Sequence, residues 1–119
     1  MATLASDIIT KRARLILNDT AVAPAPQRWA DSTLMLFLND AVTRIIQLRP
    51  DAQLNAAGAI IVIVPVAALG SAISIEDKWL IPICHYICAR SLEMQGGELL
   101  NLNASNHFQH LFDDTVKSL

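Results

Sequence analysis

Charged and aromatic residues are scarce in this sequence. Of its 119 residues, 17% are charged and 5% are aromatic, whereas 53% are hydrophobic. The net charge of −2 argues against a general nucleic-acid binder, because such domains are usually basic. A small monomer could hide this much apolar surface only with difficulty, so we expect an oligomer or a membrane protein. The length fits one domain, 1–119, that can bury a core without disulfides or metal.

Cysteine is also rare, and a signal for export is missing. Cys84 and Cys88 lie four residues apart in one predicted helix, which indicates core thiols in a reducing compartment. The N-terminal stretch contains Asp7 and a basic cluster where a signal peptide would have an unbroken apolar run. We therefore expect neither a disulfide framework nor an export signal.

The usual catalytic and metal-binding motifs are absent from the sequence. No serine occupies a G-x-S-x-G elbow, and no glycine-rich phosphate loop follows a strand. The carboxylates are scattered, mostly at predicted helix ends. The cysteine and histidine residues lack the paired short spacings of zinc sites; they are Cys84, His85, Cys88, His107 and His110. We therefore expect no enzyme, no metal site and no cofactor.

Hydrophobic periodicity predicts a mainly α-helical, bundle-like domain. Apolar residues recur at steps of three and four in four stretches. The predicted helices span about 4–18, 31–48, 76–95 and 98–117. The second is apolar on more than one side, so we expect it to be a central packing element. Asp31 and Ser32 are candidate N-caps for it, and Pro50 should end it.

Proline, glycine and capping residues mark the other boundaries. The stretch 21–27 reads as a stiff linker with two prolines, and Trp29 should pack at the start of the second helix. Ser74 and Asp77 resemble a capping box. Pro82 belongs in the first turn of the third helix or kinks it, and the glycines at 96–97 should end it.

The middle segment 54–75 contains no charged residue. Hydropathy alone would suggest a membrane span. However, all of 60–64 is β-branched, Pro65 interrupts the run, and no aromatic belt flanks it. These features favour a short β-hairpin or extended insertion over about 58–75, with strands near 59–64 and 71–75.

The predicted strand at 59–64 is apolar at every position, so both of its faces should be covered. A two-stranded hairpin is barely stable in water by itself, and the chain offers few other strands. A neighbouring subunit is the expected cover. The predicted subunit interface consists of Ile60, Ile61, Val62, Ile63, Val64, Val66 and Leu69.

Three basic residues, Lys11, Arg12 and Arg14, cluster on the polar side of the first predicted helix. Such a cluster is typical of a solvated helix face, and it also fits contact with an acidic partner or DNA. A helix-turn-helix protein would need a polar recognition helix, and 31–48 is too apolar for that role.

The stretch RWADSTLMLFLNDAVTRIIQLRPDA, at 28–52, resembles the second helix of the adaptor (head–tail connector) proteins of tailed bacteriophages. In that family the helix opens with W-x-D, contains L-N-D-A and closes with R-P-D-A. The matching residues here are Trp29, Asp31, Leu38, Asn39, Asp40, Arg49 and Pro50. LILND before this stretch, HYICARSLEMQ and the F-x-x-L-F ending are similar to neighbouring helices, so the resemblance covers about 3–52 and 76–117. Many relatives have a longer β-rich insertion than 58–75.

The resemblance implies a structural virion protein without a catalytic role. Such adaptors form a ring, commonly of twelve copies, between the portal of the head and the tail or neck proteins, and DNA passes through the lumen. The implied location is the head–tail interface, and the host cytoplasm during assembly, with no membrane. Lys11, Arg12 and Arg14 become candidate lumen or partner contacts. The candidate portal contacts, near the C-terminal end, are Asp113, Asp114, Lys117 and Leu119.

Two alternatives remain open from the sequence. One is a small membrane protein that crosses the bilayer once at 54–75. The other is a helical DNA-binding protein that uses its basic cluster, whose binding would depend strongly on salt.

Overall fold

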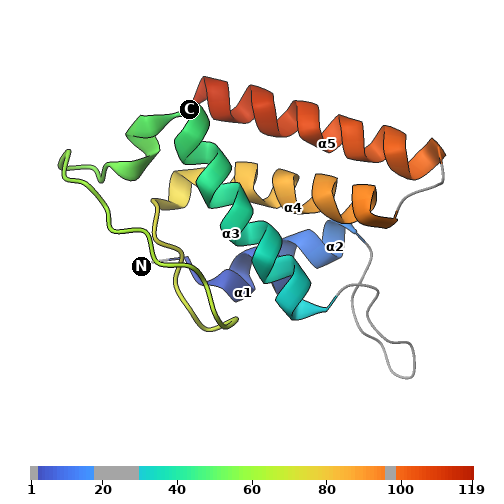
Figure 1. Cartoon of the computed structure of the whole chain (residues 1–119), viewed down its shortest axis with the longest axis horizontal. Coiled ribbons are helices and arrows are strands. Elements are labelled where there is room, and N and C mark those ends of the chain that lie inside the picture. Colours follow the sequence, from blue (N-terminus) through green and yellow to red (C-terminus); the bar gives the residue numbers. More distant parts are fainter. Residues whose placement is uncertain (1–2, 18–29, 96–98) are drawn as a thin grey trace.

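A computed structural model of the chain describes residues 3–17, 30–95 and 99–119 and shows a helical protein (Figure 1). The predicted α-helical class is confirmed, and no β-sheet is present in the described ranges. The predicted linker at 21–27, Trp29 and the glycines at 96–97 lie outside the described residues. No helix in those ranges is both long enough and apolar enough to cross a membrane.

The first helix changes its geometry along its length. It consists of α1 (Ala5–Ile8), the π-helical turn η1 (Ile9–Ala13) and α2 (Arg14–Ile16). Within the π turn, the backbone N–H of Arg14 donates to the carbonyl of Ile9, five residues back. At the start of α1, the N–H groups of Ala5 and Ser6 donate to carbonyls at 71 and 69, at 2.8 and 2.9 Å. The middle segment therefore satisfies N–H groups that a helix start leaves free.

Helix α3 (Asp31–Leu48) spans the residues that the periodicity predicted. Its N-cap is Ala30, and no side chain caps it, so the prediction of Asp31 or Ser32 as cap is wrong. The Asp31 carboxylate instead pairs with Arg14 of the first helix. As predicted, the helix ends before Pro50, which starts the short 3₁₀ turn η2 (Pro50–Gln53).

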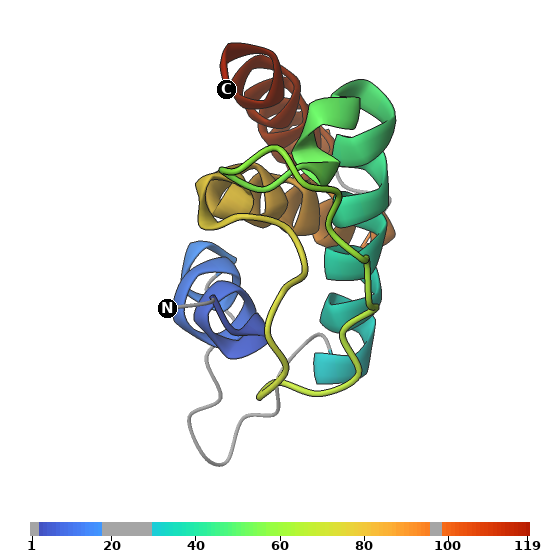
Figure 2. The same cartoon turned by 90° about the vertical axis from the view of Figure 1, so that its left-hand side faces the viewer.

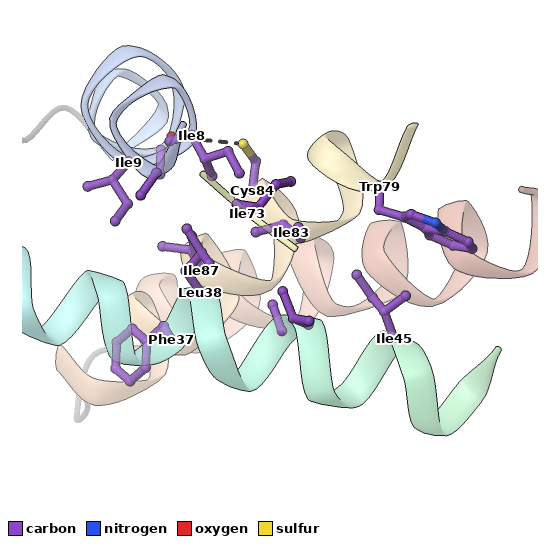
Figure 3. Close-up of a cluster of buried hydrophobic side chains, with 14 of the residues drawn as sticks. Ile8, Ile9, Phe37, Leu38, Ile45, Ile73, Trp79, Ile83, Cys84 and Ile87 are labelled. Carbon is purple, nitrogen blue, oxygen red and sulfur yellow. Dashed lines mark hydrogen bonds between the residues drawn. The ribbon is translucent and has the colours of Figure 1, made fainter. Parts of the chain in front are cut away.

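Helix α4 (Leu80–Gln95), after the 3₁₀ turn η3 (Asp77–Trp79), is the central element. It contacts α1, η1, α3 and α5, and Figure 1 shows it between α5 and the first helix. Helix α3, which was expected to be a central packing element, packs against α4, η1 and η2 and buries six apolar side chains in the core. Side chains of α4 are buried on several sides, although Ile81 and Arg90 remain exposed. Figure 3 shows Ile83, Cys84 and Ile87 between α3 and the first helix. Pro82 lies in its first turn, one of the two predicted places.

The predicted capping box before the third helix does not form. The Ser74 hydroxyl bonds to the backbone of Val64, and Asp77 accepts hydrogen bonds from the backbone N–H and hydroxyl of Thr3, at 3.1 and 2.6 Å. Both side chains have remote partners, which sequence proximity cannot reveal.

Helix α5 (Leu99–Ser118) lies along α4 (Figure 1). Phe112 and Val116 are buried in this contact, and the Phe112 ring meets Tyr86 edge-on with centroids 5.2 Å apart. The Ser105 hydroxyl donates to the carbonyl of Ala89 at 2.8 Å. Apolar packing and one buried hydrogen bond thus fasten α5 to the central helix.

The predicted β-hairpin over 58–75 is not present. This region is extended but makes only two isolated bridges, Leu54 with Ile60 and Leu4 with Ala72. The expected second strand therefore pairs near the N-terminus and not with 59–64. The physical reason is competition from side chains. The Ser74 hydroxyl bonds to the N–H and C=O of Val64, which a hairpin ladder would pair, and Asn39 fastens Val66 to α3.

Candidate assembly surface

In the extended segment 60–66, exposed side chains at 60, 62 and 64 alternate with half-buried ones at 61 and 63, and Val66 is buried. Ile60, Val62 and Val64, here called the apolar ridge, are 75%, 80% and 62% exposed. Ile61 is half-buried. Three of the seven predicted interface residues contribute to the chain's own core instead: Val66 is buried, and Ile63 and Leu69 pack against the core. Both faces were expected to be covered, with a neighbouring subunit as the cover. The chain's own core covers the inner face, while the outer face is open in the single chain.

A tight loop fixes the start of the ridge. Ile61 N–H donates to the carbonyl of Gln53 at 2.7 Å, and Asn55 N–H donates to that of Ala59 at 2.9 Å. Gly58 has a φ of +84°, a conformation that favours glycine. The Leu54–Ile60 bridge lies between these two hydrogen bonds, so the N–H and C=O of Ile60 point away from Gln53.

The outward backbone groups of the ridge are unsatisfied. Among the described residues, no hydrogen bond involves the N–H or C=O of Ile60 or Val62. The ridge therefore presents both apolar side chains and the free backbone groups of a strand edge, the combination that pairs readily with another chain.

Asn39 of α3 anchors the other end of the ridge. Its Oδ1 accepts a hydrogen bond from Val66 N–H at 2.7 Å, and its Nδ2 donates to the Val66 carbonyl at 3.0 Å. Leu38 beside it is fully buried, whereas Asp40 is exposed. In the L-N-D-A stretch, the first two residues therefore hold the core and the extended segment together.

The R-P-D stretch joins the ends of α3 and α5. Arg49 pairs with Asp51 through two hydrogen bonds of 2.9 Å and donates to the carbonyl of Val116 at 2.8 Å. Its guanidinium also lies 5.7 Å from the centre of the Trp79 ring. The hydrogen bonds from Arg49 lower the pKa of the Asp51 carboxyl. Arg49 thus satisfies a carbonyl of the last turn of α5 while Pro50 turns the chain away.

The three predicted basic contacts do not stay together. Lys11 and Arg12 are exposed, and Lys11 pairs with Asp7 at 3.0 Å, which lowers the pKa of that carboxyl. Arg14 is only 1% exposed and pairs with Asp31, so its assignment to a solvated basic face is wrong. The π turn explains this placement, because five-residue spacing brings Arg14 onto the same side as the buried Ile9.

Sequence reasoning missed a shallow groove between the first helix and α4. It encloses about 250 Å³ and is lined by Lys11, Arg12, Leu15, Ile16, Ile81, Cys84 and His85. Leu15 and Ile16 belong to the apolar period that predicts the first helix, but both are exposed. The sequence contains more apolar residues than a small core can bury, and this surplus was the only indication that some of them would be exposed.

The candidate portal contacts gather at the last turns of α5. Asp114, Lys117 and Leu119 are exposed, and Asp113 is half-buried, 3.4 Å from the Gln109 amide. The Lys117 carbonyl also lies 3.4 Å from Arg49. These residues therefore share one end of the molecule with the R-P-D stretch.

The thiols of Cys84 and Cys88 are buried, and desolvation raises the pKa of each to about 12. The pKa of His85 is lowered, first by burial and then by His107. In the described part of the chain, no three side chains of metal-binding type come together.

Comparisons with protein-family models, with curated proteins and with solved structures find no match for this chain.

Proposed function

We propose that this chain is a non-catalytic structural protein that assembles into a ring between the portal of a phage head and the tail. DNA would pass through the lumen of the ring. Two independent features support this proposal: the resemblance of 28–52 to phage adaptors, and an exposed apolar ridge that a solitary chain leaves in water.

The apolar ridge is the observation that carries the proposal. Ile60, Val62 and Val64 are large apolar residues on an uncharged, extended segment, and the backbone groups of the first two are unpaired. Exposed edges of this kind are normally shielded by charge, proline or a partner. In a ring, each copy meets its neighbours through the same two surfaces, so one such ridge per chain is sufficient.

The adaptor-like residues of 28–52 make contacts that support a rigid subunit. Asn39 fastens the extended segment to α3, and Arg49 fastens the end of α5 to the end of α3. Both contacts join α3 to elements that carry candidate partner surfaces. A ring subunit needs such rigid links, since small errors at each interface would prevent closure.

Assembly with the portal tests the proposal directly. The purified chain is mixed with the portal protein of the same phage, and the complex is examined by native mass spectrometry and electron microscopy. We expect a ring of defined copy number on the portal. The variant Val62→Ser should weaken ring formation, whereas Asp40→Ser, on an exposed part of α3, should leave it unchanged. A chain that remains monomeric and ignores the portal contradicts the proposal.

A further inference from the structure

The groove between α2 and α4 is a second apolar surface left open by the fold. Leu15, Ile16 and Ile81 line it and are 62%, 48% and 44% exposed. Lys11 and Arg12 lie at the same groove, and their charged groups add hydrogen-bond donors to an aliphatic lining. A surface of this composition favours an uncharged apolar segment that also offers acceptors.

The apolar ridge has the complementary properties. Its side chains are aliphatic, its segment 54–75 contains no charge, and the carbonyls of Ile60 and Val62 lack donors among the described residues. Across the groove, Arg12 is exposed and forms no salt bridge with another described residue. The groove therefore supplies hydrogen-bond donors that the ridge carbonyls lack.

The two surfaces lie on different sides of the molecule. In Figure 2 the first helix lies below α4, whereas the light-green segment that follows α3 starts above it, in front of α4, and then runs down the right side along α3. A chain cannot place its own ridge in its own groove in this arrangement. Contact between unlike patches of two copies is heterologous, and its repetition can close a ring.

We propose that the apolar ridge of one copy occupies the groove between α2 and α4 of the next copy. The side chains of Ile60 and Val62 contact Leu15, Ile16 and Ile81 there, and Arg12 and Lys11 donate hydrogen bonds to the ridge carbonyls. This inference rests on the proposed ring, which supplies the second copy, and it names both halves of the ring interface.

Cross-linking between two single-substitution preparations tests the contact. One preparation carries Val62→Cys and the other, marked by an affinity tag, carries Leu15→Cys; they are mixed, assembled on the portal and treated with a short bis-maleimide. The native Cys84 and Cys88 are buried, and each preparation alone reports any background from them. We expect covalent pairs only in the mixture. Val62→Cys mixed with Leu36→Cys, an exposed position on α3, is the matched control.

The outcomes of this experiment distinguish failure of the proposed contact between ridge and groove from failure of the proposed ring function. Assembled rings that cross-link from Val62 to Leu15 support the inference. Rings that cross-link Val62 with Val62, or Val62 with Leu36 to the same extent, overturn the inference and leave the proposed function standing. If neither rings nor cross-links form, both proposals fall.

The proposed hydrogen bond from Arg12 can be tested separately, by measuring the concentration at which rings assemble. Arg12→Ala should shift the concentration for half-assembly upward by roughly tenfold, which corresponds to one charge-assisted hydrogen bond per interface. Arg90→Ala, which removes an exposed arginine of α4 paired with Glu93, is the control and should cause no shift. Equal effects of the two substitutions would overturn the assignment of Arg12.

Discussion

Single side chains with remote partners determine much of this fold, and they are the residues that sequence reasoning placed least well. Arg14 belongs to a basic triplet in the sequence but is buried and pairs with the partly exposed Asp31. Ser74 resembles a helix cap but bonds to Val64. In both cases the polar group has a partner 10 or more residues away, and no local pattern encodes such a partner.

Asn39→Ala should destabilise the chain by about 2–3 kcal/mol, because both backbone groups of Val66 would lose their partner in a largely buried place. Urea denaturation followed by circular dichroism measures this change. Asp40→Ala, at the exposed neighbouring position, should stay within about 0.5 kcal/mol of the wild type. Similar losses for the two variants would contradict the anchoring role of Asn39.

Acidification should destabilise the chain through His85. Because its pKa is lowered in the folded state, the unfolded chain binds a proton more readily. The contribution of His85 is thus complete above its ordinary value of 6.5 and declines as the pH falls below it. Urea midpoints between pH 7.5 and 5 should fall in the wild type and fall less in His85→Gln. The same substitution at exposed His110 is the control; identical slopes in the wild type and His85→Gln would refute the role of His85.

The two thiols should be inert in the folded protein. With the pKa raised to about 12, roughly one thiol in ten thousand is ionised at pH 8. Reaction with Ellman's reagent should therefore be slow in buffer and should release two equivalents at once in denaturant. Fast reaction of either cysteine in buffer would show that the core around α4 opens readily.

Helix positions were predicted well because they depend on local information. The apolar period gave α3 its observed bounds, and Pro50 gave its end. The hairpin was wrong because β-branched composition indicates an extended backbone but does not name its hydrogen-bond partners. In the structure those partners include side chains of α3 and of the segment itself. The π turn in the first helix also lacked any signal in the periodicity.

Arg49→Lys should loosen the junction between α3, η2 and α5. Lysine keeps the charge but cannot form the two-pronged contact with Asp51 and also reach the Val116 carbonyl. We expect a lower unfolding free energy, together with faster hydrogen exchange in the last turn of α5. Arg44→Lys, on the exposed side of α3, is the matched control. Unchanged exchange in α5 would contradict the link.

At the scale of the whole molecule, the surplus of apolar residues indicated that some apolar surface would be exposed, but the sequence did not show where that surface lies. The sequence led us to expect a neighbouring subunit, with an interface over 60–64, Val66 and Leu69. The structure divides the segment, because one face packs on the chain's own core and the other remains exposed. The groove beside α4 arises only when the first helix and α4 come together, so no single stretch of sequence predicts it.

Paired substitutions on the two faces of the extended segment separate folding from assembly. Val62→Asp should leave unfolding free energy within about 0.5 kcal/mol of the wild type, because the side chain is exposed, and should abolish rings. Ile63→Asp should cost about 2 kcal/mol or more in stability, because its side chain packs against the core. Urea denaturation and native mass spectrometry provide the two readouts. Loss of stability in Val62→Asp would show that the ridge belongs to the folded core.

The π-helical turn also fixes how the cations of the first helix are divided between inside and outside. A regular α-helix would rotate Arg14 about 140° away from Ile9, towards the solvent. The wider turn keeps Arg14 above Ile9 and leaves Lys11 and Arg12 outside. The π turn thus divides the three basic residues: Arg14 forms an internal ion pair, and Lys11 and Arg12 stay on the surface. Any relative that lacks this widening must hold the start of α3 by other means.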